Sequence, residues 1–218
     1  MPKWLKTIVA SLLLPACIGG GLALWRVLQA SGAADTIWVA TGAGAACWLA
    51  IYLLLPKPMW VYVVGHEFTH ALWTWLMGGR VKKFKASAQG GHVVVTRNNF
   101  LIALAPYFFP LYAIGVILAF RAGSHFWNWR PYAVWFHLLL GAAYAFHITL
   151  TWHILKSHQS YIHEQGYLFS AVVIYLGNLM VLLVGIPLLT AQVEVPTALR
   201  WWAADTAELL LRLVHRGL

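Results

Sequence analysis

Long apolar stretches, separated by short polar breaks, run through most of the chain. A transmembrane helix needs about 20 mostly apolar residues, so each long stretch predicts one span. Pro56-Lys57-Pro58 predicts a tight turn between two of them, because proline lacks an N–H donor and disfavours helix in the preceding residue. Six spans are expected, at roughly residues 7–28, 37–55, 59–77, 99–119, 132–155 and 167–189. The predicted fold class is an all-α polytopic membrane protein.

The N-terminal apolar stretch has two interpretations. Lys3 and Lys6 precede it as in a signal peptide, and Leu14-Pro15-Ala16-Cys17 is similar to a lipoprotein cleavage box. The stretch continues to Trp25, however, which is too long for the apolar part of a signal peptide. We therefore expect a first transmembrane helix.

Residues 80–97 interrupt the helical pattern. Segments 81–86 and 92–96 have the composition of strands, and Gln89-Gly90-Gly91 supplies a turn between them. These features predict a small membrane-associated β-hairpin. Its basic residues are expected to contact lipid headgroups: Arg80, Lys82, Lys83, Lys85 and Arg97.

After the last apolar stretch, Pro196 and Thr197 resemble the start of a helix. Apolar and small side chains then recur at helical spacing, which predicts an amphipathic interfacial helix over residues 196–216. The alternative is a solvated tail that packs on nothing. We expect residues 1–218 to form one integral membrane domain, with two N-terminal transmembrane helices in 1–58, a core in 59–190 and the amphipathic helix last.

The composition supports a membrane protein. The chain is 61% hydrophobic and only 10% charged, with a mean hydropathy of +0.70, whereas soluble domains carry about 25% charged residues. The net charge of +9 is attributed to loops that face anionic lipid rather than to nucleic-acid binding, since no basic stripe is interleaved with aromatic residues.

Two histidines four residues apart, His66 and His70, flank Glu67 inside the third apolar stretch. On a helix, such residues project from one face, so both imidazoles can bind the same zinc ion. The glutamate between them is placed to accept a proton from a water molecule at that metal. Such residues are costly in hydrocarbon and indicate a functional site. The sequence therefore predicts zinc bound by His66 and His70, with Glu67 as the catalytic base.

A catalytic zinc ion usually has three protein ligands, so one more is needed. Glu164 is the only acidic residue between positions 68 and 193. It lies between the fifth and sixth predicted spans, beside His163 and close to His158, while His147 lies inside the fifth span. We predict Glu164 as the third ligand, with His163 and then His147 as alternatives.

The segment from Gly65 to Ala71 around the histidines is followed by Gly78-Gly79, and then by the hairpin that contains Gly91. Together with residues 99–107 and 166–178, this pattern resembles the site-2 protease family of intramembrane zinc metalloproteases, over about residues 59–190. The resemblance implies a multi-pass protein of the bacterial inner membrane that hydrolyses peptide bonds in or near transmembrane segments. Members of this family use an aspartate in a later helix as third zinc ligand. Here the span 167–189 has no aspartate and Tyr161 stands at the expected place, so either Glu164 replaces it or the site is incomplete.

The expected partners are a transmembrane protein or peptide substrate and the lipid bilayer, with no nucleic acid. A peptide bond within a helix is shielded by the helix's own hydrogen bonds, so the substrate must be extended before attack. The hairpin at 81–96 could hold it by strand addition. Asn98 and Asn99 are candidates for stabilising the oxyanion.

Two alternatives remain. A membrane di-iron oxygenase also uses histidines on transmembrane helices, but the chain has no His-x-x-His-His cluster and such an enzyme would leave Glu67 unexplained. An inactive protease relative that binds membrane partners, with zinc in a structural role, would explain the missing aspartate. The intact Glu67 argues against it, because a structural metal needs no general base.

Overall fold

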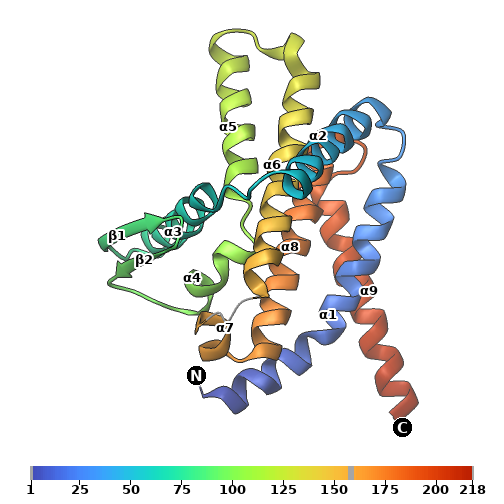
Figure 1. The fold of residues 1–218 in the computed structure, drawn as a ribbon. Coiled ribbons are helices and arrows are strands. Elements are labelled where there is room, and N and C mark those ends of the chain that lie inside the picture. The colour runs from blue at the N-terminus through green and yellow to red at the C-terminus, as the bar shows by residue number, and fades with distance from the viewer. Residues whose placement is uncertain (1, 157–159, 218) are drawn as a thin grey trace. The chain divides into compact units, whose positions relative to one another are not determined.

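The computed structural model describes residues 2–156 and 160–217, most of which lie in helices (Figure 1). The chain divides into two compact units. One is Thr36–Gln159, and the other combines Met1–Asp35 with Ser160–Leu218. Each unit has its own packed hydrophobic cluster.

The unit Thr36–Gln159 contains the predicted metal-binding motif and the hairpin. Its elements, in order, are α2 (Asp35–Leu54), α3 (Met59–Leu76), β1 (Val81–Ser87), β2 (Gly90–Val95), α4 (Phe100–Leu104), the 3₁₀ helix η1 (Ala105–Tyr107), α5 (Leu111–Phe126), the 3₁₀ helix η2 (Arg130–Tyr132) and α6 (Ala133–Leu155). The other unit contains α1 (Lys3–Ala30), α7 (Ser160–Gln165), α8 (Tyr167–Thr190) and α9 (Val195–Gly217).

Several helices are apolar enough to cross a membrane. Among the described residues, four segments meet the requirement of length and composition: Lys3–Ala30, Asp35–Leu54, Arg130–Leu155 and Tyr167–Thr190. A bent pair, Phe100–Tyr107 with Leu111–Phe126, makes a fifth if it counts as one span. The all-α class with long apolar helices is confirmed, but the prediction of six spans is wrong. Segment 59–77 does form a helix, α3, yet its polar side chains make it less apolar than the others: His66, Glu67, Thr69, His70 and Thr74.

The predicted span 99–119 is not a single straight helix. The segment that ends in η1 meets α5 at an angle of 77°. Pro106 lies inside η1 and Pro110 immediately precedes α5. Because proline cannot donate a backbone hydrogen bond, these two residues prevent a continuous helix. The first part of the broken segment contacts α3 instead, through Ile102 and Tyr107.

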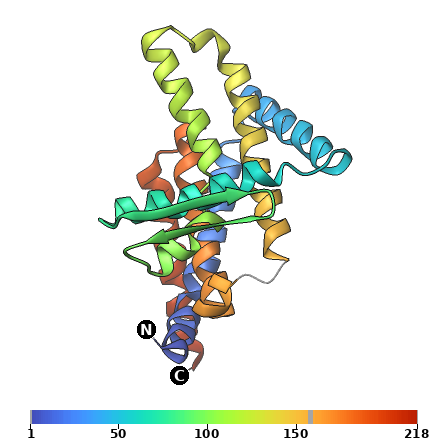
Figure 2. The same cartoon turned by 60° about the vertical axis from the view of Figure 1, so that its left-hand side comes forward.

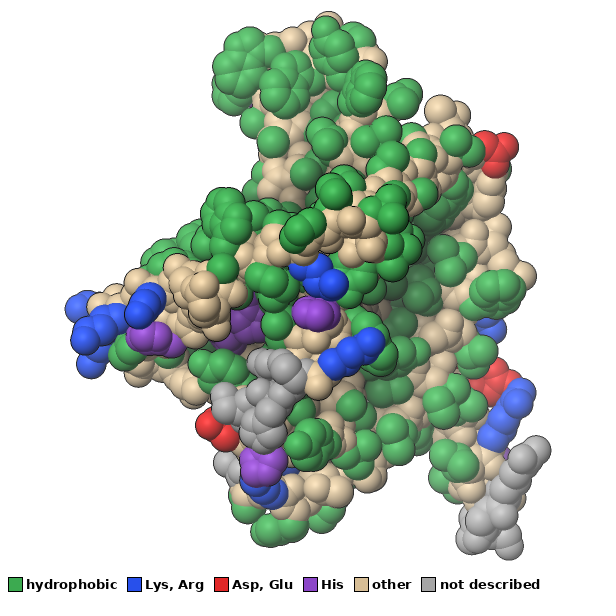
Figure 3. All heavy atoms as spheres, viewed as in Figure 1, with side chains coloured by type: hydrophobic (Ala, Val, Ile, Leu, Met, Phe, Trp, Pro, Cys, Tyr) green, Lys and Arg blue, Asp and Glu red, His purple; other side chains and the backbone are tan. Residues whose placement is uncertain are grey.

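The predicted hairpin is confirmed, but Gly90 and Gly91, which were predicted to form the turn, belong to strand β2. Strands β1 and β2 pair antiparallel, from Val81 opposite Val95 to Ser87 opposite Gly90, and residues 88–89 form the turn. The hairpin runs alongside α3 (Figure 2). Lys and Arg side chains, blue in Figure 3, gather at this hairpin, which is the arrangement that contact with anionic headgroups requires.

Helices α2 and α6 cross closely because glycine lies at the contact on both. A Cβ atom at Gly44 would lie 1.8 Å from the carbonyl oxygen of Leu138, and one at Gly141 would lie 1.9 Å from that of Thr41. Small residues allow such backbone contact between apolar helices. Next to the crossing, Trp48 Nε1 donates a hydrogen bond to Thr149 Oγ1 at 2.8 Å. A buried cluster then joins α2, α3 and α6: Trp48, Tyr62, Val63, Phe146 and Leu150.

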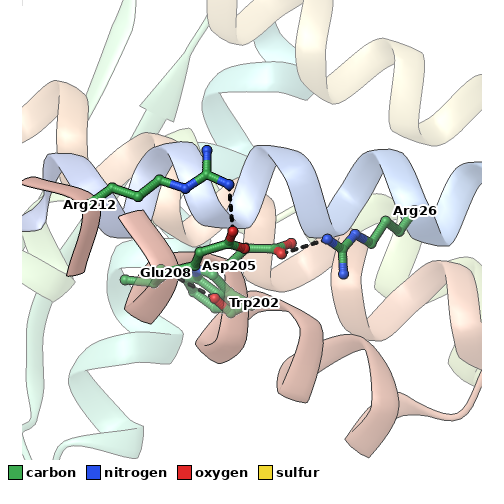
Figure 4. A network of polar contacts seen from close by, with 6 residues as sticks. Arg26, Trp202, Asp205, Glu208 and Arg212 are labelled. Atoms are coloured by element: carbon green, nitrogen blue, oxygen red, sulfur yellow. Dashed lines mark hydrogen bonds and ion pairs between the residues drawn. The ribbon is translucent and has the colours of Figure 1, made fainter. Parts of the chain in front are cut away.

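In the other unit, α9 packs along α1. Trp202 Nε1 donates to the carbonyl oxygen of Ala16 at 2.8 Å, next to Gly20, where a Cβ atom would lie 2.9 Å from the same nitrogen. Arg26 donates to the carboxylate of Asp205 at 2.8 Å, and Asp205 is only 3% exposed (Figure 4). The predicted amphipathic helix therefore exists, and the alternative of a tail that packs on nothing is wrong.

The second half of α9 has a different surface. Its large apolar side chains are exposed: Leu210, Leu211, Leu213 and Val214. The ion pair between Arg212 and Glu208, one turn apart, lies on the same exposed part of the helix (Figure 4). The predicted contact of this part with lipid therefore stays a prediction.

Candidate metal-binding site

His66 and His70 lie one turn apart on α3, as their spacing predicts. Their ring centroids are 5.0 Å apart and the rings are nearly perpendicular, at 76°. His70 is almost completely buried, at 2% exposure, while His66 is half-buried. The two imidazoles can therefore approach one ion from the same helix face.

A backbone carbonyl fixes the orientation of the His70 ring. Nδ1 of His70 lies 2.8 Å from the carbonyl oxygen of Ile102 in α4. Since a carbonyl can only accept, Nδ1 carries the proton and Nε2 of the neutral ring keeps its lone pair. Metal-binding histidines are commonly held in this way, by a carbonyl at the nitrogen that does not bind the metal.

The carbonyl that orients His70 is itself held by a helix cap. Asn99 is the N-cap of α4, and its side-chain oxygen accepts from the N–H of Ile102 at 2.9 Å. Asn99 was a candidate for oxyanion stabilisation, but the structure gives its oxygen a capping role. This cap positions α4, and α4 in turn positions the imidazole of His70.

Glu67 lies on a different side of α3, against the hairpin. Its side chain is only 6% exposed, and its Oε2 atom is buried without a hydrogen-bond partner among the described residues. A Cβ atom at Gly91 of β2 would lie only 2.6 Å from Cγ of Glu67. Because Gly91 has no side chain, the backbone of β2 can approach the carboxylate closely. The hairpin therefore lies directly beside the motif, as a role in holding the substrate would require.

The broken segment α4–η1 and helix α6 complete the surroundings of His66. The ring of Tyr107 in η1 packs edge-on against His66, with centroids 5.3 Å apart. A small cavity of about 20 Å³ lies beside His66 and is also lined by His147 of α6. His147 is 6% exposed, and its Nε2 atom is buried without a hydrogen-bond partner among residues 2–156 and 160–217.

The residues considered as the third ligand have different outcomes. His147 lines the same cavity as His66. Glu164 and His163 lie on α7, which belongs to the other unit, and both side chains are exposed. Their approach to His66 therefore remains a prediction. His158 lies outside the described residues.

The side chains of His66, His70 and Glu67 supply some, but not all, of the groups that a zinc site requires. Two neutral imidazoles and a nearby buried carboxylate are what a catalytic zinc site uses. Within the described part of the chain, however, no three His, Cys, Asp or Glu side chains are grouped closely enough to hold one metal ion together. His66, His70 and Glu67 thus lie as the motif predicts, and no third ligand is grouped with the two histidines in that part of the chain.

Sequence reasoning missed the roles of Ile102 and Tyr107. Their contacts with the histidines depend on the bend between α4–η1 and α5. The signal for that bend was present in the sequence, since Pro106 and Pro110 interrupt the apolar stretch from which one span was predicted.

No protein-family model matches the chain, and no curated protein or solved structure matches it. The resemblance to the site-2 proteases therefore stays an expectation from the sequence.

Proposed function

We propose that this chain is an intramembrane zinc metallopeptidase, which hydrolyses peptide bonds in or near the transmembrane segments of membrane-protein substrates. The observation that carries the proposal is Glu67, a buried carboxylate between two one-turn-spaced histidines and directly beside a strand. A glutamate in this position has no structural partner for Oε2 among the described residues, which favours a chemical role. The resemblance to bacterial family members favours the inner membrane.

His66 and His70 would hold the metal. When bound, zinc polarises the scissile carbonyl and makes a coordinated water acidic. Glu67 would accept the proton of the attacking water and deliver it to the leaving amine. General acid–base catalysis of this kind contributes roughly 10²–10⁴-fold to the rate. Burial of the carboxylate keeps bulk water away from this proton transfer.

The hairpin would hold the substrate in an extended form. The sheet of the described chain has two strands, so each strand has one edge without a strand partner there. An extended peptide can add to such an edge through backbone hydrogen bonds. Since β2 contacts Glu67 through Gly91, a peptide on the β2 edge would lie close to the catalytic carboxylate.

Three measurements on the purified full chain test this proposal: zinc content, cleavage of a synthetic transmembrane peptide in liposomes, and cleavage after treatment with a chelator. We expect zinc in the wild type, cleavage that the chelator abolishes, and recovery on addition of zinc. A wild-type chain that takes up no zinc and cleaves no peptide would contradict the proposal.

A second candidate function is that of an inactive, partner-binding relative of the proteases. It is supported by the finding that no third ligand is grouped with the two histidines in the described residues. An inactive relative that binds membrane partners would retain zinc through His66 and His70 and cleave nothing. Zinc uptake without cleavage of any transmembrane peptide would favour this reading.

A further inference from the structure

Helices α3 and α6 meet at a small cavity whose walls include two histidines. The cavity has a volume of about 20 Å³, and both His66 of α3 and His147 of α6 line it. Most of the other lining side chains are apolar or aromatic, among them Phe109, Leu111 and Phe146. The hydroxyl groups of Tyr62, Thr69 and Tyr112 also line the cavity, but each already donates a hydrogen bond to another group of the protein. The two imidazoles therefore supply the ring nitrogens available in its walls.

Each of these histidines carries one buried nitrogen that lacks a partner among the described residues. They are Nδ1 of His66 and Nε2 of His147. Buried polar atoms in proteins are nearly always hydrogen-bonded, and a buried water often supplies the bond. A cavity needs about 10–15 Å³ to hold one water molecule, so this cavity has room for one.

We propose that a single water molecule in this cavity connects Nδ1 of His66 to Nε2 of His147, which makes His147 a positioning residue for the metal ligand His66. The water accepts a hydrogen bond from Nδ1–H of His66 and donates one to Nε2 of His147, so all three groups stay neutral. With its proton held at Nδ1, His66 presents Nε2 to the metal, as His70 does through its bond to Ile102. This inference rests on the proposed function, since it assigns a role at the same metal site.

The positions of the three histidines favour a role for His147 as a positioning residue and not as the third metal ligand. The three imidazoles are not grouped closely enough to share one ion, whereas a water-sized cavity lies beside two of them. Partners that orient a metal-binding histidine typically contribute 10–100-fold to metal affinity. His147→Ala should therefore weaken the metal site without removing a ligand from it.

The test uses the full chain in detergent with Co²⁺ as a spectroscopic probe. Co²⁺ affinity is measured by competition with a chelator, and the number of metal-bound imidazoles by X-ray absorption. The control is His137→Ala, which removes another histidine of α6 that also carries a buried ring nitrogen without a partner in the described chain.

For His147→Ala we expect 10–100-fold weaker Co²⁺ binding with an unchanged number of imidazole ligands. His147→Gln should stay close to the wild type, because its amide oxygen can accept the hydrogen bond of the water. Unchanged affinity in a folded His147→Ala chain would overturn the inference, as would an equal loss in His137→Ala. One imidazole fewer in His147→Ala would also overturn it, because His147 would then be a ligand. A wild-type chain that binds no Co²⁺ would instead contradict the proposed metal site itself.

Discussion

Gly91 of the hairpin lies directly against Glu67 of α3: a Cβ atom at position 91 would fall 2.6 Å from Cγ of the glutamate. The same atom would lie 2.7 Å from the carbonyl oxygen of Lys85, which is backbone and cannot move by itself. The absence of a side chain at this one position thus determines how closely the hairpin approaches the carboxylate.

We predict that Gly91→Ala lowers peptidase activity while zinc content is unchanged. The new methyl group must push β2 away from α3, and a misplacement of about 1 Å in an active site can cost roughly 10²-fold in rate. Cleavage of a transmembrane peptide and zinc analysis of the same sample check this. His92→Ala, at the next and exposed position of β2, should cleave at nearly the wild-type rate. Equal rates for Gly91→Ala and the wild type would show that this contact is unimportant.

His66→Ala and His70→Ala are each expected to lose most of the zinc that the wild type binds, because each removes one of the two ligands that we propose on α3. Metal analysis of the purified proteins measures this directly. His92→Ala, which removes an exposed histidine from the hairpin, should retain the wild-type zinc content. Full zinc occupancy in both α3 variants would contradict the site assignment.

Gly44→Ala should destabilise the unit Thr36–Gln159. Its methyl group would lie 1.8 Å from the carbonyl oxygen of Leu138, so α2 must move away from α6. Overpacking of this kind costs roughly 1–3 kcal/mol of unfolding free energy. At Gly42, on the same helix, a Cβ atom would meet nothing within 4 Å, and Gly42→Ala is expected to leave the melting temperature unchanged or to raise it. Identical melting temperatures for the two variants in detergent would exclude the close crossing.

In the other unit, Arg26→Met should lower stability more than Arg212→Met. Arg26 pairs with Asp205, which is 3% exposed, so its removal leaves a buried carboxylate without that partner. Loss of a hydrogen bond to a charged group costs roughly 1.5–3 kcal/mol, and the half-exposed Arg26 suggests the lower end. Arg212 pairs with an exposed glutamate one turn away, a contact worth only about 0.3–0.5 kcal/mol. The melting temperatures of both variants in detergent measure this difference. An equal decrease in the two variants would show that the Arg26–Asp205 ion pair adds no more stability than the exposed pair.

The sequence was sufficient for the elements that depend on local pattern. The spacing of His66 and His70 determines that they share a helix face, and the strand composition of 81–96 predicted the hairpin. The amphipathic helix after Pro196 was also recognised from its periodicity. Each of these features depends on residues that are close together in the chain.

Contacts between distant segments could not be predicted in the same way. The bond from His70 to Ile102 and the shared cavity of His66 and His147 join residues 32 or more positions apart. The contact of His70 with Ile102 depends on the 77° bend at Pro106 and Pro110, and the cavity is lined from both sides of that bend, by Pro106 and Leu111. The prediction of α3 as one of six spans failed for a different reason, since the polar residues of the predicted metal site reduce the apolar character of that helix.

The most direct test of the central claim is the cleavage rate of Glu67→Gln, measured with a transmembrane peptide in liposomes at matched zinc content. Glutamine has nearly the same size as glutamate but cannot accept the proton of the attacking water. We predict a zinc-loaded, folded protein whose cleavage rate falls by roughly 10²–10⁴-fold. Cleavage by Glu67→Gln at the wild-type rate would contradict a peptidase mechanism at this site.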